Sequence, residues 1–231
     1  MRTPEFDERN QQPVYTEKLA YWFFRLNGCL TIENFVVHPD VGSDQRTDAD
    51  IIGVRFPYRA ELFANPMTDH PVFRQIGDRP FLFIAEVKGR TCRLNGPWTS
   101  PDRQNIQRVL RAVGAIPLPE VNAAADALYQ TNKYDSDHYA VRLFGLGDRI
   151  GDFSINYPNA IPLTWDEVLR FIFRRFQQYH EQKRAHPQWC STGTLLWKLA
   201  EQTRDEETFV SVVRQLLTND QGRRVVSVGT D

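Results

Sequence analysis

The chain has 231 residues, 41% of them hydrophobic and 12% aromatic, which is enough to bury the core of one domain of moderate size. Its formal net charge of −1 argues against a protein coated in positive charge, although it leaves room for a local basic patch. The three cysteines are far apart, without the paired spacing of zinc sites or disulfide frameworks, and no apolar run approaches the ~18 residues of a membrane span, so we expect a soluble, cytoplasmic protein.

The first half of the chain predicts a helix followed by strands. Residues 1–13 are polar and are expected to be flexible. A helix is predicted from about Val14 to Asn27, because apolar residues recur at helical spacing and Gly28 supplies a C-terminal stop. Four later runs are rich in residues that favour strands: 30–37, 50–56, 81–87 and 138–146.

Residues 57–80 separate the second and third of these strands and contain four of the fourteen prolines. They are expected to form an insertion between the two strands. A long loop beside a binding site is a common place for substrate selection. We therefore expect this insertion to lie beside any site that the two strands form.

Helices are predicted to dominate the rest of the chain. Ser100 is expected to cap a helix that ends at Gly114, with a proline and an acidic residue in its first turn. The sequence Thr164-Trp165-Asp166-Glu167 is a capping box that begins a long amphipathic helix. Further helices are predicted at 119–130, 193–201 and 205–217. Residues 161–218 are thus expected to form a helical extension packed on the core, followed by a flexible tail over 219–231.

The third strand run ends in Glu86 and Lys88, which point the same way because side chains alternate along a strand. Asp48 and Asp50 form a second pair near the start of the preceding strand. If Asp50 and Glu86 lie on neighbouring strands, they supply the hard oxygen ligands that Mg²⁺ or Mn²⁺ prefers, and the carbonyl of Val87 could add another. Lys88 would then orient a metal-bound water or neutralise charge on a phosphate. This arrangement predicts a phosphodiester substrate.

An ordinary structural explanation exists for the same residues. Glu86 and Lys88 could form an ion pair at a strand end, with Asp48 and Asp50 in a turn. A second Glu-x-Lys motif, Glu181-Gln-Lys183, has no strand before it and is interpreted as a solvated helical face. The first motif is favoured by its context, and because only five lysines occur against 23 arginines.

The order of elements and acidic residues resembles the restriction-endonuclease-like, or PD-(D/E)xK, phosphodiesterase superfamily. Glu17 lies in the first helix, Asp50 at a strand start, and Glu86-Val87-Lys88 at the end of the next strand. Thr16-Glu17-Lys18, leading through Leu26-Asn27-Gly28 into a strand, is similar to the opening of the Holliday-junction-resolvase-like branch. The resemblance covers about residues 14–146.

The resemblance implies an α/β fold with a mixed β-sheet core flanked by helices, over about residues 14–160. It implies hydrolysis of DNA or RNA with Mg²⁺ or Mn²⁺ as the cofactor. By resemblance, Asp50 and Glu86 are the metal ligands, Lys88 is the catalytic lysine, and Glu17 is a further acidic residue. Two departures stand out: the insertion lengthens the Asp50-to-Glu86 separation, and an alanine precedes Asp50 in place of proline. Asp48 is interpreted either as an auxiliary ligand or as a loop residue.

A basic segment follows the proposed site and indicates nucleic acid as the partner, and our hypothesis is that this nucleic acid is DNA. Between Lys88 and Gly114 the net charge is +5, in a chain whose overall charge is −1. The arginines are expected to contact backbone phosphates, and Gln104 and Trp98 a base or sugar. The alternative is that the helical arginines only solvate the outer face of their helix. The residues expected to bind nucleic acid are Arg90, Arg93, Gln104 and Arg108.

Three functional hypotheses follow from the sequence. The first is a metal-dependent nuclease acting on DNA or RNA. The second is a catalytically inactive subunit of the same fold that binds nucleic acid or a protein partner. The third is a protein-interaction module, since the C-terminal helices could form a homodimer or dock on another protein.

Overall fold

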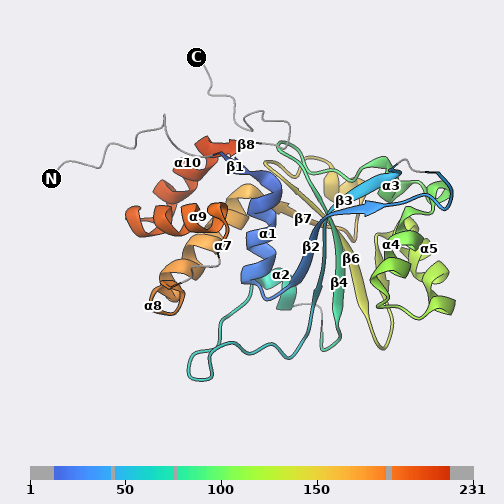
Figure 1. Cartoon of the computed structure of the whole chain (residues 1–231), viewed down its shortest axis with the longest axis horizontal. Helices are drawn as coiled ribbons and strands as arrows, with labels where there is room; N and C mark the ends of the chain where they lie inside the picture. Colours follow the sequence, from blue (N-terminus) through green and yellow to red (C-terminus); the bar gives the residue numbers. More distant parts are fainter. Residues whose placement is uncertain (1–12, 43–44, 75–76, 186–188, 219–231) are drawn as a thin grey trace, which may run out of the picture.

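The computed structural model of the chain describes residues 13–42, 45–74, 77–185 and 189–218 (Figure 1). The segments expected to be flexible, 1–13 and 219–231, lie outside the described residues except for Pro13. The described chain is a mixed α/β structure in which a mixed sheet stands between two layers of helices. The α/β class and the mixed, helix-flanked sheet are therefore confirmed.

None of the helices in these ranges has both the length and the apolar character that a membrane-crossing segment requires.

The main sheet is organised around β4 (Phe81–Val87), every residue of which is buried. This strand pairs antiparallel with β3 (Thr47–Arg55) and parallel with β6 (Ala140–Gly147). A strand that is covered on both faces is expected to be continuously apolar, and the run at 81–85 has that character. The other strands of the sheet are β2 (Leu30–Val37) beside β3, and β5 (Lys133–Asp135) and β7 (Ile161–Thr164), which both pair with β6.

The side chains of β4 alternate between two hydrophobic clusters, one on each face of the sheet. Phe83 lies on the face covered by the N-terminal helix and stacks on Phe24 with ring centroids 4.3 Å apart. Gly53 in β3 makes room for this ring, since a Cβ atom there would lie 2.2 Å from the ring of Phe83. Leu82 and Ile84 face the opposite cluster.

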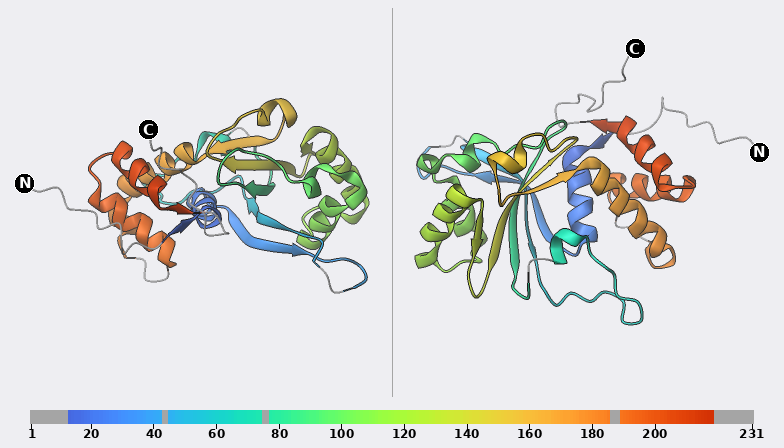
Figure 2. Two further views of the ribbon diagram at one scale, coloured as in Figure 1. Left: turned by 90° about the horizontal axis from the view of Figure 1, so that it is seen from above. Right: turned by 180° about the vertical axis from the view of Figure 1, so that it is seen from behind.

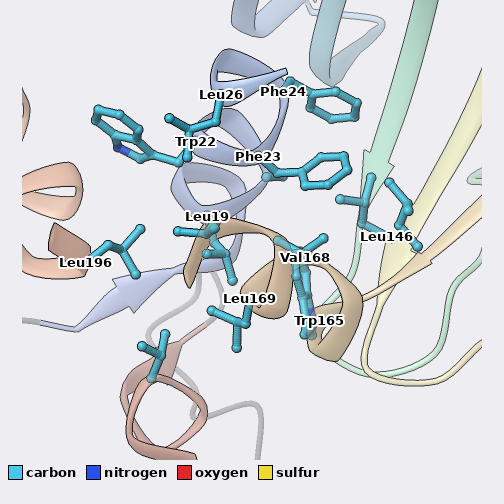
Figure 3. Close-up of a cluster of buried hydrophobic side chains, with 14 of the residues drawn as sticks. Leu19, Trp22, Phe23, Phe24, Leu26, Leu146, Trp165, Val168, Leu169 and Leu196 are labelled. Carbon is cyan, nitrogen blue, oxygen red and sulfur yellow. The ribbon is translucent and has the colours of Figure 1, made fainter. Parts of the chain in front are cut away.

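The helices divide between the two faces, as Figure 2 shows. On one face, α1 and α7 pack together through a cluster that includes Leu19, Phe23 and Leu169 (Figure 3). This layer consists of α1 (Thr16–Leu26), α7 (Trp165–Gln178), α9 (Ser191–Gln202) and α10 (Glu206–Leu216). The opposite layer includes α3 (Gly96–Thr99), α4 (Asn105–Val113), α5 (Val121–Thr131) and α6 (Phe153–Asn156).

Several predicted elements differ from the structure at their ends. The helix expected from Ser100 is interrupted at Gln104, whose φ of 52° is left-handed, so a 3₁₀ turn at Pro101–Arg103 precedes α4. The long C-terminal helix stops at Gln178, and α8 (His180–Lys183) follows separately. The capping box at its start is confirmed, with the Glu167 amide donating to Thr164 Oγ1 at 3.3 Å.

Short strands account for most of the elements that were not predicted. β5 and β7 have three and four residues, and β7 shows that the segment 161–218 begins with a strand of the main sheet. A separate two-stranded sheet joins β1 (Val14–Tyr15) to β8 (Leu217–Thr218) in parallel. The predicted strand 50–56 begins earlier, at Thr47.

The insertion between β3 and β4 does not lie beside the carboxylates. It leaves from the Arg55–Phe81 end of the hairpin, whereas Asp50 and Glu86 lie at the other end, about 17 Å away along the strands. The expectation that the insertion adjoins the site is therefore wrong, because the register places its two ends at the far side of the sheet. Its one short helix is α2 (Pro71–Arg74).

Asp69 attaches the insertion to the rest of the protein. This buried carboxylate accepts hydrogen bonds from Arg55 on β3, from Arg59 Nη1 at 2.9 Å, and from Arg175 Nη2 on α7 at 3.4 Å. Arg175 is itself buried and also donates to the carbonyl of Thr68 at 2.6 Å. One acid thus compensates several guanidinium groups that are shielded from water.

We expect Asp69→Ala to destabilise the protein by about 3 kcal/mol, because it leaves buried guanidinium groups without a carboxylate. Urea denaturation followed by circular dichroism measures this loss. Asp137→Ala, which removes an exposed carboxylate, is the control and should change the free energy of unfolding by less than about 0.5 kcal/mol. Equal stability of the two variants would contradict the role given to Asp69.

Candidate functional site

The carboxylates of Asp50 and Glu86 lie on neighbouring strands, at the end of their shared ladder. Ile51 pairs with Ala85 in the antiparallel register of β3 and β4, and one further step places Asp50 opposite Glu86. Glu86 is in turn opposite Gly145 of β6. The predicted placement of the two acids on adjacent strands is therefore what the structure has.

The edge strand β2 is distorted at the same row of the sheet. Its register with β3 passes from the Glu33–Ile51 pair to the Phe35–Ala49 pair, and Asn34 between them has a left-handed φ of 51°. A non-glycine residue in this region is uncommon and often marks a functional or strained position. Asparagine is among the residues that tolerate it best, which is the one signal of this bend in the sequence.

The Asp50 side chain accepts a hydrogen bond from the backbone of β4, as a backbone carbonyl of β3 would in a regular pair of strands. Its Oδ2 accepts a hydrogen bond from the Val87 amide at 2.6 Å. Burial raises the pKa of Asp50 to about 7, and the nearby Glu86 carboxylate adds to the rise, while the Val87 amide and Lys88 oppose it. Both effects penalise a negative charge at this position.

Glu86 is buried and accepts hydrogen bonds from three side chains. Oε1 accepts from the ammonium of Lys88 and from the amide of Asn95, and Oε2 accepts from Trp98 Nε1 at 2.5 Å. All three partners are donors, so they suit an ionised carboxylate. Burial raises the pKa of Glu86, and Lys88 counteracts that rise. A carboxylate has about four lone-pair directions, of which three are used here.

Trp98 and Asn95 have a role that the sequence did not indicate. We expected Trp98 to contact a base or sugar, but this side chain is buried and donates to Glu86, so the expectation is wrong. Its short helix α3 directs the indole inward, among the apolar residues under α4 and α5. No spacing rule links Asn95 or Trp98 to Glu86, because the contact depends on how the loop folds back over β4.

Lys88 has a fixed backbone and a side chain that solvent reaches. Its amide donates to the carbonyl of Leu146 at 2.9 Å, and its own carbonyl accepts from Trp165 Nε1 at 3.2 Å. The side chain is 19% exposed and pairs with Glu86. The ion-pair explanation of these two residues is thus present in the structure, and it is compatible with a chemical role for both.

The remaining acidic candidates lie differently. Asp48 is exposed on β3, so the alternative that Asp48 and Asp50 belong to a turn is wrong. Its charge contributes to the raised pKa of both Asp50 and Glu86, which places it near them. Glu17 is buried in the first turn of α1, where it accepts from Thr16 Oγ1 at 3.1 Å. Among the described residues, no three His, Cys, Asp or Glu side chains form a group that could hold a metal ion, so the structure does not gather Glu17 with Asp50 and Glu86.

Of the four residues predicted to contact nucleic acid, three are exposed and one is held in an ion pair. Arg90, Arg93 and Gln104 are exposed. The loop that carries the two arginines is fixed to the chain after β6, since the Cys92 amide donates to the Arg149 carbonyl at 2.8 Å. Arg108, in contrast, makes a two-pronged ion pair with Asp40, with Nη1 2.7 Å from Oδ1.

Arg108 also borders a cavity on this side of the sheet. The cavity has a volume of about 610 Å³ and lies between β2 and α4. Two polar atoms, Arg108 Nε and Gln107 Oε1, are buried there without a hydrogen-bond partner in the described part of the chain. The other lining residues include His38, Gln104 and Arg111.

Comparison with known proteins gives no assignment. No protein-family model matches the sequence, no curated protein matches it, and no solved structure matches the fold.

The raised pKa of Asp50 predicts a stability effect that depends on pH. The folded-state pKa of about 7 lies above the ordinary value of 3.8, so native Asp50 holds its proton more tightly and ionising it costs folding free energy as pH rises through about 7. Asp50→Asn removes this cost and keeps an acceptor for the Val87 amide. We therefore expect the variant to melt several degrees, about 4–8 °C, above the wild type at pH 8, with a smaller gain at pH 5.

Asp48→Asn is the matched control for this measurement, because it changes an exposed acid on the same strand. It should give a much smaller gain at pH 8. A melting temperature for Asp50→Asn that stays level with the wild type at both pH values would contradict the burial cost assigned to Asp50.

Proposed function

We propose that this protein is a divalent-metal-dependent nuclease that hydrolyses phosphodiester bonds in nucleic acid, preferably DNA. The observation that carries the proposal is the meeting of Asp50, Glu86 and Lys88 at one end of the β3–β4 hairpin. Two carboxylates and one ammonium at a strand end are a set suited to metal-assisted hydrolysis.

The donor set is compatible with a hard divalent cation. Asp50 and Glu86 would hold Mg²⁺ or Mn²⁺ through carboxylate oxygens. Burial raises the pKa values of both acids, and the Glu86 carboxylate adds to the rise at Asp50, so a nearby cation would favour the ionised form of each. Such an ion, when bound, would polarise a phosphoryl oxygen and lower the pKa of a water ligand. Glu86 keeps one lone-pair direction for this purpose beside its three hydrogen-bond partners.

Lys88 would act on the substrate. Its side chain is 19% exposed and its ammonium is carried on a flexible stem, so it can turn from the carboxylate to a phosphate oxygen. There it would offset negative charge that develops in the transition state. Trp98 and Asn95 would position Glu86 while Lys88 moves, because their hydrogen bonds do not depend on the lysine.

The order of elements supports a PD-(D/E)xK phosphodiesterase-like core. Helix α1 is followed by the antiparallel strands β2, β3 and β4, then by helices α4 and α5 and by β6 parallel to β4. The proposed acids and lysine occupy the second and third strands of this series. Glu17 keeps only its place in the first helix, and we assign it no contact with the metal.

A catalytically inactive, nucleic-acid-binding subunit is the second candidate, and one observation favours it. Glu86 already has three donors, one of them the proposed catalytic lysine. In a protein without catalysis these contacts would simply stabilise a buried charge. Cleavage assays separate the two candidates.

The nuclease proposal predicts that Lys88→Met, Glu86→Gln and Asp50→Asn each reduce cleavage by about 100-fold or more, because each removes charge that acts on the transition state. The assay uses single-stranded, double-stranded and branched DNA and RNA, with Mg²⁺, Mn²⁺ or EDTA. Lys198→Met, on the exposed side of α9, is the control and should cleave like the wild type. If the wild type leaves every substrate intact with both metals, the inactive-subunit candidate replaces the nuclease.

Exposed arginines beside the site should govern affinity for DNA. The double variant Arg90→Gln/Arg93→Gln should bind DNA more weakly and lower the slope of log K against log salt by about 2, since it removes two phosphate contacts. Fluorescence anisotropy over a salt series measures both quantities. Arg204→Gln, an exposed arginine between α9 and α10, is the control. An unchanged slope in the double variant would exclude these two contacts.

A further inference from the structure

A second cavity lies on the side of the sheet that α1 covers. It has a volume of about 410 Å³ and is bounded by the C-terminal half of α1, the start of β2, the insertion and α8. Its walls include the apolar side chains of Leu26, Leu30 and Trp189. Charged groups also line it: Arg25, Arg59, Glu61 and Lys183.

Lys183 is the unusual member of this wall. Its side chain is buried, with 8% of the residue exposed. In the part of the chain that the structure describes, its ammonium makes no ion pair and no hydrogen bond. Burial, together with the guanidinium groups of Arg175 and Arg59, lowers the pKa of Lys183, and only Glu61 opposes this. Burial and the neighbouring guanidinium groups thus disfavour a further positive charge at this position.

The neighbouring cations leave this charge uncompensated. Arg25 donates to the hydroxyl of Tyr21 at 2.7 Å and lies 5.4 Å from the ring centroid of Trp22, and within the described ranges it has no acidic partner. Arg59 already forms ion pairs with Asp69 and Glu61. Three cations therefore face the cavity against one carboxylate.

Arg175 adds to the positive charge near the cavity, although it is not one of the residues that line it. Its Nη1 is buried and has no hydrogen-bond partner among the described residues. The carboxylate of Asp69, which Arg175 reaches at 3.4 Å, is shared with two other arginines. The whole cluster thus holds more positive charge than its acids neutralise.

We infer that this cavity binds a small organic anion, with Lys183, Arg25 and Arg59 holding its phosphate or carboxylate group. The volume lies in the range of small-molecule sites, and it exceeds the space that an inorganic oxyanion needs. Leu26, Leu30 and Trp189 would cover the apolar part of the ligand. The site is independent of the proposed nuclease centre, because it uses none of its residues.

The test measures binding by isothermal titration calorimetry and by thermal unfolding of the full chain. The probes are adenosine monophosphate, benzoate and inorganic phosphate, with uncharged adenosine as the control ligand. We expect an organic anion to bind with a Kd below about 1 mM and to raise the melting temperature, whereas adenosine has no effect. Comparison of the first two probes distinguishes a phosphate from a carboxylate group.

Two variants tie the response to the cavity. Lys183→Met and Arg25→Gln should each weaken binding by about tenfold or more, since each removes one charge that holds the anion. Lys198→Met removes an exposed lysine and should bind like the wild type. Without ligand, Lys183→Met should melt at or above the wild-type temperature, because it removes a positive charge that burial and the neighbouring cations disfavour.

Three results would overturn the inference. One is the absence of binding by the wild type to all three anions at concentrations up to about 10 mM. Another is equal anion binding by wild type, Lys183→Met and Arg25→Gln, which would mean that the salt acts on the whole surface. A response to inorganic phosphate alone would show an oxyanion pocket with no place for an organic ligand.

Discussion

The hydrogen bond from the Val87 amide to the Asp50 carboxylate is the contact on which the candidate site depends. It joins β3 to β4 at the point where their backbone pairing ends at Ile51 and Ala85. The Asp50 side chain thus adds one more hydrogen bond between the two strands, beyond the last backbone pair. This bond holds Asp50 against the strand that carries Glu86. Without this contact, mutual repulsion of the two carboxylates would favour a wider separation of the strand ends.

The site concentrates groups that burial and like charge disfavour. Asp50 and Glu86 both have raised pKa values, and three donor side chains surround Glu86. Folding stability is therefore lower than it would be with neutral residues, as is common at sites that bind or catalyse. The cation cluster under α1 repeats the same situation with the opposite sign of charge. The two groups of like charge thus lie on different sides of the sheet.

Features whose residues lie close together in the sequence could be predicted from it. The apolar run into Glu86 and Lys88 located β4, and the alternation rule placed both side chains together. The capping box located the start of α7 for the same reason, because its signal lies within four residues. The succession of one helix and three strands also followed from local periodicity, whereas the mixed sheet flanked by helices was implied by the family resemblance.

Features that arise from tertiary contacts could not be predicted. Trp98 looked like a surface aromatic beside basic residues, yet a loop that folds back places it under Glu86. The break at Gln104 and the bend at Asn34 depend on neighbouring elements, since neither residue is a glycine. The far-end position of the insertion required the register of the hairpin, and Asp40 became relevant only once its loop was seen against Arg108.

The parallel pairing of β4 with β6 has a consequence for how the molecule reaches its native state. The proposed site belongs to one hairpin, whereas β6 must arrive through a long crossover that contains α3, α4, α5 and β5. Closing such a loop costs chain entropy before the strand contacts can offset that cost, so parallel pairing is slow compared with the pairing of strands closer in sequence. The acids of β3 and β4 are thus expected to come together early in folding, while water still solvates both carboxylates. They lose this water only later, when β6 and the helices of the crossover pack against β4.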